Sequence, residues 1–189
     1  ATLWVAGPAL ARAHERDWML LAGAAAVLAL MMGLAAFMVR RVIALPMRQL
    51  AGGVCAITVG EGAERRGFVA TSVTSLSAEP PSLLVAVNRS SSAWSAIGRF
   101  RHFGASVLAQ RHLPLAQQLA GRTGAQGEHR FAGAAWHRGE TGAPLLSDAV
   151  AAIDCDVEDI IERHSHGIII GRVRAVTSMR EERGLTNQQ

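Results

Sequence analysis

Short apolar runs bounded by glycine, proline and serine follow one another along the chain from residue 45 onward. Runs of this length and composition are typical of β-strands. They cover residues 52–60, 64–77, 82–89, 102–110, 152–159 and 166–176. In the fifth run apolar and acidic residues alternate with a period of two, which predicts one buried and one solvated strand face. The sixth run is apolar enough to predict burial on both faces.

Three short helices are predicted, one before the first strand and two between later strands. Pro46 can open a helix over Met47–Ala51, because the N–H that proline lacks is not needed there. Ser90 or Ser91 can cap a helix that ends near residue 100. A helix over 113–120 ends at Gly121, followed by a glycine-rich loop. Without a βαβ rhythm or an internal repeat, the pattern favours an antiparallel barrel, mainly β with short helices, over residues 45–177.

A separate apolar segment precedes this domain. Residues 18–39 carry no charge and would span roughly 33 Å as a helix, close to the hydrocarbon thickness of a bilayer. Arg40 and Arg41 follow it, and the excess of arginine on that side favours a cytoplasmic C-terminal domain. We therefore expect an N-terminal tail over 1–17 and a transmembrane helix over 18–41. A buried core helix is the alternative for the same residues. The polar residues 178–189 are predicted to form a C-terminal tail.

Composition changes this picture little. The chain has no lysine, so all 19 basic residues are arginine, and the net charge is only +4. No arginine cluster is interleaved with stacking aromatic residues, so we expect no nucleic-acid partner. Cys55 and Cys155 lie in apolar runs at a spacing that fits no metal site. They are predicted to be small buried thiols, not disulfide-bonded.

One stretch departs from ordinary strand chemistry. Residues 70–92 place many serines and threonines among apolar residues, with only Glu79 and Arg89 charged. A half-buried strand usually carries charged groups on its wet face, whereas this one carries small hydroxyl groups. The pattern suggests that something other than water lies against the strand. A serine-rich solvent face of an ordinary sheet is the alternative.

Five segments, in order, resemble the short-chain flavin reductases, which include the reductase components of two-component flavin monooxygenases. They read MRQLAGGVCAITVG, GFVATSVTSLSAEPPSLLVAVNRSSSAW, HFGASVLA, HRFAGAAWHRGETGAPLLSDAVAAIDCDVE and HSHGIIIGRV, and the match extends from about residue 46 to 176. The resemblance implies an FMN-binding split β-barrel with antiparallel Greek-key strands. It also implies a homodimer with FMN or FAD near the subunit interface.

The resemblance implies the flavin site as well. The strand at 70–77 would lie along the flavin ring and ribityl chain, and the turn at 88–92 would hold the phosphate at a helix N-terminus. Phe131 would pack near the flavin pocket, although a plain core position suits it almost equally. The expected flavin-binding residues are Thr71, Ser72, Val73, Thr74, Ser75, Asn88, Arg89, Ser90, Ser91, Ser92 and Phe131.

Two histidines near the C-terminal end, His164 and His166, are candidates for metal or nicotinamide binding. His164 and His166 would share one strand face, but no third ligand is spaced for a metal. In the family a Gly-Asp-His pattern lies near the nicotinamide. His166 retains the histidine, while His164 and Ser165 replace the glycine and the acid. His166 is thus the expected nicotinamide-binding residue, with a structural or solvated histidine as the alternative. The carboxylates Asp154, Asp156, Glu158 and Asp159 are predicted to form a solvated strand face.

The implied activity is that of an NAD(P)H:flavin oxidoreductase. Hydride would pass from NADH or NADPH to FMN or FAD, with no catalytic acid or base from the chain. The reduced flavin would supply a partner such as a monooxygenase. The rival hypothesis is a non-enzymatic flavin-binding or sensory module of a membrane protein, because residues 40–51 also resemble a membrane-to-HAMP junction. A split barrel for another ligand, such as haem, is a third.

Overall fold

The computed structural model describes residues 24–34 and 53–178. The chain divides into two compact units, residues 1–41 and 42–189. In the first unit residues 24–34 form a helix with exposed side chains. Within the described ranges, no helix combines the length and apolar character needed to cross a membrane. The rest of the predicted span over 18–41, the predicted helix at 47–51 and residues 179–189 lie outside the described residues.

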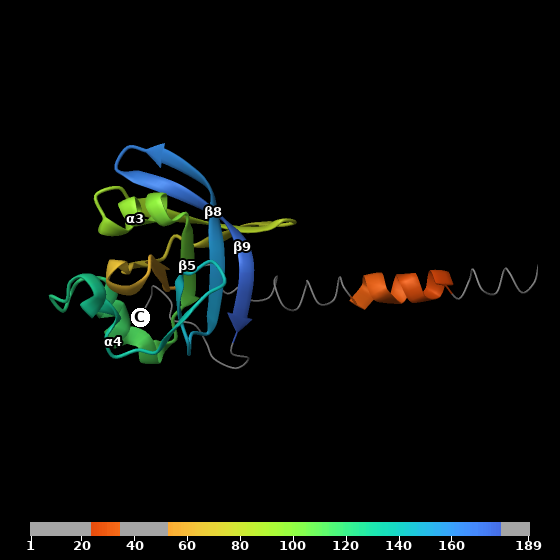
Figure 1. Ribbon diagram of the computed structural model, residues 1–189, viewed down its shortest axis with the longest axis horizontal. Coiled ribbons are helices and arrows are strands. Elements are labelled where there is room, and N and C mark those ends of the chain that lie inside the picture. The colour runs from red at the N-terminus through yellow and green to blue at the C-terminus, as the bar shows by residue number, and fades with distance from the viewer. Residues whose placement is uncertain (1–23, 35–52, 179–189) are drawn as a thin grey trace, which may run out of the picture. The chain divides into compact units, whose positions relative to one another are not determined.

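The described part of the second unit is built on seven antiparallel strands in the order β2-β1-β5-β8-β9-β4-β3. Figure 1 labels three of them, β5, β8 and β9. The bounds of the seven strands are β1 Cys55–Val59, β2 Arg66–Ala70, β3 Thr74–Ala78, β4 Pro81–Asn88, β5 His102–Val107, β8 Ala151–Arg163 and β9 His166–Ser178. A two-stranded sheet pairs β6 Trp136–Arg138 with β7 Pro144–Leu146. The prediction of a mainly antiparallel β domain is confirmed.

Two short α-helices and three 3₁₀ turns connect the strands. They are α3 Ser92–Phe100, α4 Leu113–Leu119, η2 Gly62–Glu64, η3 Gln110–His112 and η4 Gly127–Phe131. The Ser91 hydroxyl caps α3 by accepting a hydrogen bond from the Ala93 N–H at 3.2 Å. Of the two predicted caps, Ser90 and Ser91, the second is therefore the one used. Gly121 follows the last residues of α4 with a φ of +77°, a conformation that glycine adopts without strain.

The prediction of a single strand over 64–77 is wrong, because residues 71–73 interrupt it and separate β2 from β3. β2 and β3 lie at opposite edges of the sheet, β2 beside β1 and β3 beside β4. Val73 turns into the core with 2% of its surface exposed, while Thr71 and Ser72 are exposed. Apolar and small hydroxyl residues continue through the break without a proline or glycine, so the sequence pattern does not reveal it.

The prediction that the strand at 166–176 is buried on both faces is also wrong. Along β9 the residues Gly167, Ile169, Gly171 and Val173 are buried, and those between them are half-buried or exposed. The inward glycines leave room for aromatic rings. A methyl group at Gly171 would lie 2.5 Å from Cζ of Phe103. The strand thus has one core face. Ile169 lies on it, and Ile168 and Ile170 lie on the opposite face.

The core has two parts. The larger one fills the space between the strands and α3, and the smaller one lies beneath α4, β6 and β7. Figure 1 shows α3 and α4 on the same side of β5, β8 and β9. Cys55 and Cys155 are buried free thiols in the larger core, as predicted. Burial raises the pKa of Cys55 to about 12, so this thiol has little tendency to ionise.

Candidate functional site

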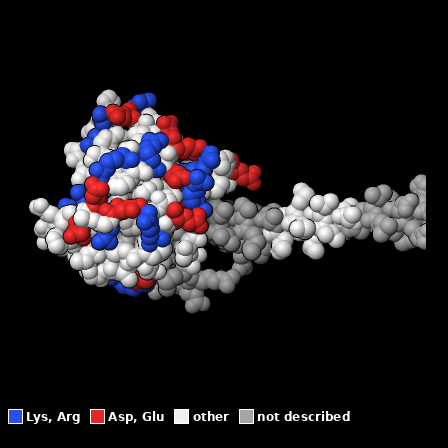
Figure 2. Space-filling view, viewed as in Figure 1, with Lys and Arg blue, Asp and Glu red and all other residues white. Residues whose placement is uncertain are grey.

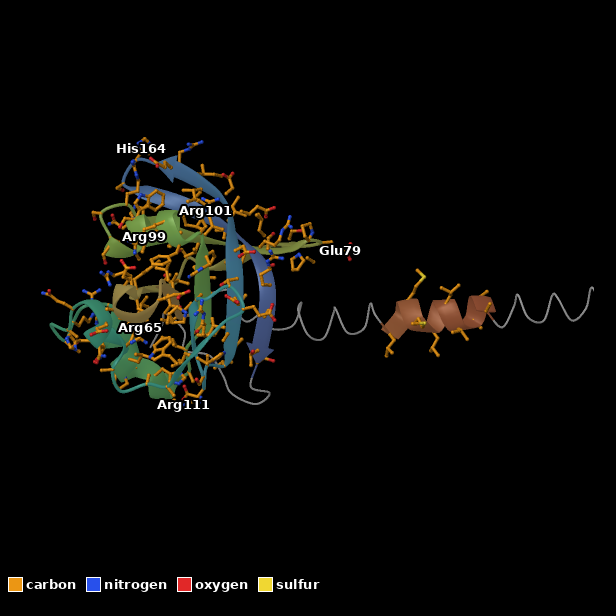
Figure 3. All side chains as sticks on the ribbon, in the orientation of Figure 1. Arg65, Glu79, Arg99, Arg101, Arg111 and His164 are labelled. Atoms are coloured by element: carbon orange, nitrogen blue, oxygen red, sulfur yellow. The ribbon has the colours of Figure 1, made fainter. Side chains whose placement is uncertain are left out.

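Two turns meet where β4 ends and β9 begins. We call residues 88–92 the serine turn and residues 164–166 the histidine turn. Asn88 and His166 are direct partners in the antiparallel pairing of β4 with β9. The Arg89 backbone N–H also donates to the Ser165 carbonyl at 2.9 Å. Figure 3 shows His164 at the end of the β8–β9 hairpin. The structure therefore brings the expected phosphate-binding and nicotinamide-binding residues together.

Hydrogen bonds within the serine turn leave one residue available. The Asn88 side-chain oxygen accepts from both the N–H and the hydroxyl of Ser90, at 2.9 and 2.8 Å. Ser91 caps α3. Across residues 53–178, the hydroxyl and backbone N–H of Ser92 have no hydrogen-bond partner. They lie exposed at the first position of α3, where free N–H groups and the helix dipole favour an anion.

Part of the predicted hydroxyl stretch forms β3, which pairs antiparallel with β4 and runs away from the serine turn. The Ser72 hydroxyl accepts from the Ala86 N–H at 3.2 Å and lies 3.3 Å from the Ala86 carbonyl. Thr74 pairs with Leu84, four residues before Asn88, which corresponds to about 13 Å along a strand. In the part of the chain that the structure describes, the hydroxyls of Thr71, Thr74 and Ser75 have no hydrogen-bond partner, and all three residues are exposed. Thr74 and Ser75 are successive residues of β3, so their hydroxyls face opposite sides of the sheet.

Arg89 is engaged with the histidine turn. One guanidinium nitrogen lies 2.7 Å from the Glu162 carboxylate, and another donates to the His164 carbonyl at 3.1 Å. Further ion pairs along the β8–β9 hairpin join Glu158 to Arg172 and Asp156 to Arg174. Acidic and basic side chains accordingly intermingle on the face shown in Figure 2.

The two histidines do not share a strand face, and this prediction is corrected. His164 has a φ of +49° and lies with Ser165 in the two-residue turn between β8 and β9. His166 begins β9, is exposed, and its Nδ1 lies 2.9 Å from the Ser165 hydroxyl. Residues 24–34 and 53–178 contain no group of three or more side chains that could hold a metal ion.

Phe131 lies in another part of the domain. Its buried ring packs edge-on against Trp136, with centroids 5.0 Å apart, and the Arg65 guanidinium lies 4.9 Å above it. These contacts belong to η4, β6 and the start of β2, not to the serine turn. A role for Phe131 in flavin binding stays a prediction.

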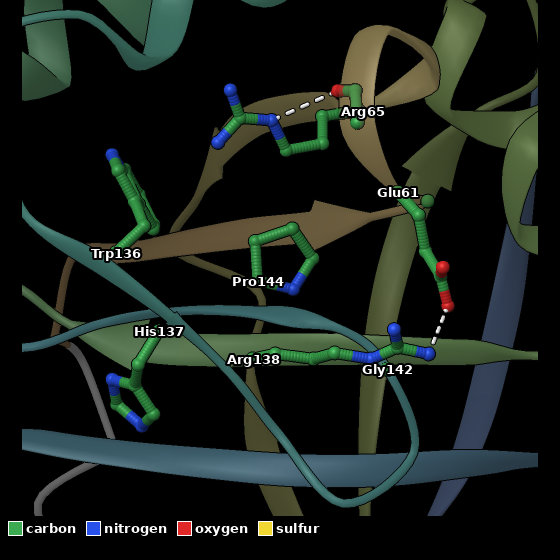
Figure 4. A pocket seen from close by; sticks show the side chains of 9 residues that line it. Glu61, Arg65, Trp136, His137, Arg138, Gly142 and Pro144 are labelled. Atoms are coloured by element: carbon green, nitrogen blue, oxygen red, sulfur yellow. Dashed lines mark hydrogen bonds and ion pairs between the residues drawn. The ribbon is translucent and has the colours of Figure 1, made fainter.

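A pocket that the sequence did not indicate lies between the β1–β2 and β6–β7 loops. It measures about 220 Å³ and is drawn in Figure 4. Its lining residues are Gly60, Glu61, Gly62, Arg65, Trp136, His137, Arg138, Gly142 and Pro144. Glu61 and Arg138 form an ion pair at 2.6 Å across it.

A buried carboxylate holds the loop beside this pocket. Asp154 is fully buried and accepts from the Thr141 N–H at 2.8 Å and from the Thr141 hydroxyl at 2.5 Å. The predicted solvated acidic face is therefore wrong at Asp154, although Glu158 and Asp159 are exposed. His102 is buried nearby, and burial lowers the pKa of its imidazole, with Asp154 partly opposing that effect.

Comparisons with known proteins agree with this architecture. The flavin reductase like domain family matches residues 47–189. The FMN reductase (NADH) RutF of Bradyrhizobium diazoefficiens is 39% identical over 130 residues, which cover 69% of this chain and 71% of that protein.

Two solved structures are similar in fold. The NADH:FAD oxidoreductase SgcE6 of Streptomyces globisporus C-1027, in complex with NAD and FAD fragments, is 32% identical with a TM-score of 0.63. The match covers 70% of this chain and 78% of that one. BorF, the flavin reductase component of a bacterial two-component tryptophan halogenase, is 28% identical with a TM-score of 0.63. Here the match covers 77% of this chain and 98% of that one.

The family match covers most of the chain, including every strand of the domain that the structure describes. The predicted split-barrel fold class is thereby confirmed. From its sequence and its architecture, this chain belongs to the flavin reductase-like family.

Proposed function

We propose that this chain is an NAD(P)H:flavin oxidoreductase that transfers hydride from NADH or NADPH to FMN or FAD. The observation that carries the proposal is the available hydroxyl and backbone N–H of Ser92 at the N-terminus of α3, next to the paired ends of β4 and β9. The names of the relatives, FMN reductase (NADH) and NADH:FAD oxidoreductase, support it.

The available donors fit a flavin nucleotide. Ser92 would bind the phosphate through its hydroxyl and backbone N–H, and a charge-assisted hydrogen bond is worth about 1.5–3 kcal/mol. Thr71, Thr74 and Ser75 would donate to the ribityl chain and ring. The flavin, when bound, supplies the hydride-accepting chemistry. The chain's own residues would bind the flavin, orient it toward the nicotinamide and exclude water from the site. Arg89 would hold the histidine turn in place beside the phosphate.

Ser165 would take over an orienting role at the nicotinamide site. It replaces the acid of the family pattern, and its hydroxyl lies 2.9 Å from Nδ1 of His166. This contact restricts the imidazole ring and leaves Nε2 to face a nicotinamide.

His166→Ala is expected to raise the KM for NADH about tenfold, the effect of losing one hydrogen bond of about 1.4 kcal/mol. The KM for FMN should change less than twofold, because His166 is not among the expected flavin-binding residues. Steady-state kinetics with each substrate varied in turn measure both values. His164→Asn is the matched control, since asparagine tolerates positive φ. Equal increases in both KM values would remove His166 from the nicotinamide site.

A homodimer is part of the proposal. Half-buried apolar side chains gather on the outer face of three neighbouring strands, and cross-strand pairing places them together. They are Leu84, Ala86, Ile161, Ile168 and Ile170. Asn88 and His166 continue the same face, so a second copy would cover it next to the site. Light scattering of the purified protein should give the mass of two chains, and Ile168→Glu should shift it to one. A monomeric wild type contradicts this arrangement.

A partner enzyme that consumes reduced flavin follows from the chemistry, and a monooxygenase is our proposal. BorF, described as the reductase component of a halogenase system, supports the general arrangement. A cytoplasmic location, and attachment to a membrane through residues 18–41, stay predictions from the sequence.

Loss of NADH absorbance on adding FMN to the purified chain tests the proposed function. We expect multiple turnovers with FMN and none without a flavin. Tight FMN binding without NADH or NADPH oxidation would overturn the reductase proposal and favour the sensory module.

A further inference from the structure

Trp94 lies directly on Gly167. The tryptophan is in the first turn of α3, two residues after Ser92, and is half-buried against the core. A methyl group at Gly167 would be 2.1 Å from Cζ3 and 2.2 Å from Cη2 of the indole ring. Side chains do not approach so closely, so the ring occupies the space that only glycine leaves open.

The glycine belongs to the strand that carries His166. Gly167 follows His166 and pairs with Val87 on β4 and with Glu162 on β8. Successive residues of a strand face opposite sides, so the ring supports the inner side while His166 faces outward. Trp94 therefore lies behind the histidine turn.

This end of the hairpin has few other supports. β5 pairs with β8 only as far as Asp156, and beyond Val157 the β8 strand pairs with β9 alone in the described part of the domain. Figure 1 shows this end of the hairpin next to α3. Arg89 also holds the turn, through Glu162 and the His164 carbonyl. Trp94 packs against Gly167, the cross-strand partner of Glu162.

We propose that Trp94 is a positioning residue that seats the histidine turn on α3, so that flavin binding at the serine turn and nicotinamide binding at His166 are coupled. The serine turn leads directly into the helix that carries the ring, so an anion bound at Ser92 stabilises the same helical turn that supports β9. The inference rests on the proposed function for its ligands. The contact itself does not depend on it.

A double-mutant cycle tests the contact. Gly167→Ala alone should raise the KM for NADH about tenfold, because the methyl group displaces the ring and the turn. In a Trp94→Ala background the same substitution should change that KM less than twofold, since the space is then free. Gly98→Ala is the control, because a methyl group at this glycine of α3 meets no atom within 4 Å. Additive effects of the two substitutions would overturn the proposal.

Hydrogen–deuterium exchange gives a readout that needs no turnover. In the flavin-free protein, Trp94→Ala should speed exchange in residues 162–168 and leave β1 unchanged, while Trp94→Phe should preserve protection. Added FMN should slow exchange in the histidine turn of the wild type and not of Trp94→Ala. If the wild type binds no flavin, the proposed function fails, and exchange in the flavin-free protein still tests the contact. If the wild type reduces flavin, but Trp94→Ala changes neither the exchange rate in residues 162–168 nor the effect of Gly167→Ala on the KM for NADH, the inference alone fails.

Discussion

Replacing Ser90, Ser91 and Ser92 together by alanine is expected to weaken FMN binding about a hundredfold, since about 2.7 kcal/mol of hydrogen bonding to a charged group is lost. The substitution removes the available hydroxyl of Ser92, the Ser90–Asn88 contact and the cap of α3. Without the cap, the helix N-terminus is less well ordered to present its N–H groups to a phosphate. Titration of the variant with FMN, followed by flavin fluorescence, measures the loss.

Single variants separate binding from folding in this turn. Ser92→Ala should weaken FMN binding with no change in Tm, because its hydroxyl has no partner among the described residues. Ser91→Ala should lower stability by about 1 kcal/mol through loss of the N-cap. Ser95→Ala, one turn further along α3, is the control and should change FMN affinity little. A triple variant that melts earlier but binds FMN as tightly as the wild type contradicts the phosphate assignment.

Asp154→Ala should lower the free energy of unfolding by about 3 kcal/mol, because two hydrogen bonds to a buried carboxylate are lost. The Thr141 N–H would lose its acceptor, and the loop between β6 and β7 would lose its attachment to β8. Gly139 lies so close that a methyl group there would be 2.6 Å from the carboxylate. Urea denaturation with a linear extrapolation measures the change.

A neighbouring acid provides the comparison for Asp154. Asp156 lies two residues further along β8 and forms a partly exposed ion pair with Arg174. Such pairs contribute about 0–1 kcal/mol, so Asp156→Ala should have a small effect. Similar losses for the two variants would show that Asp154 is not a special anchor of this loop.

Local patterns predicted the elements whose causes are local. The strands at 52–60, 82–89 and 102–110 were identified by apolar runs between turn residues, and Ser91 by its position before an amphipathic helix. The break at 71–73 was not predicted, because no proline or glycine marks the point where the chain changes its strand partner.

Contacts between residues far apart in the sequence determine the features that local patterns did not predict. Asp154 looks like its solvated neighbours, and only a threonine thirteen positions earlier in the chain makes its burial favourable. Gly167 and Trp94 are far apart in sequence, and nothing near either residue indicates their contact.

The candidate site was predictable in composition but not in detail. An unusual density of hydroxyls marked the stretch from Thr71 to Ser92. Which hydroxyls are available depends on tertiary partners, since Ser72 is bonded to the Ala86 backbone. Arg89 looked like a phosphate ligand, yet Glu162 supplies a carboxylate for it from a strand more than seventy residues later.

Titration of the purified chain with FMN tests the central claim most directly. Isothermal titration calorimetry should show saturable binding of about one FMN per chain, weakened in the Ser92→Ala variant and unchanged in Ser95→Ala. Absence of measurable heat and of fluorescence change with FMN, FAD and riboflavin alike would contradict it.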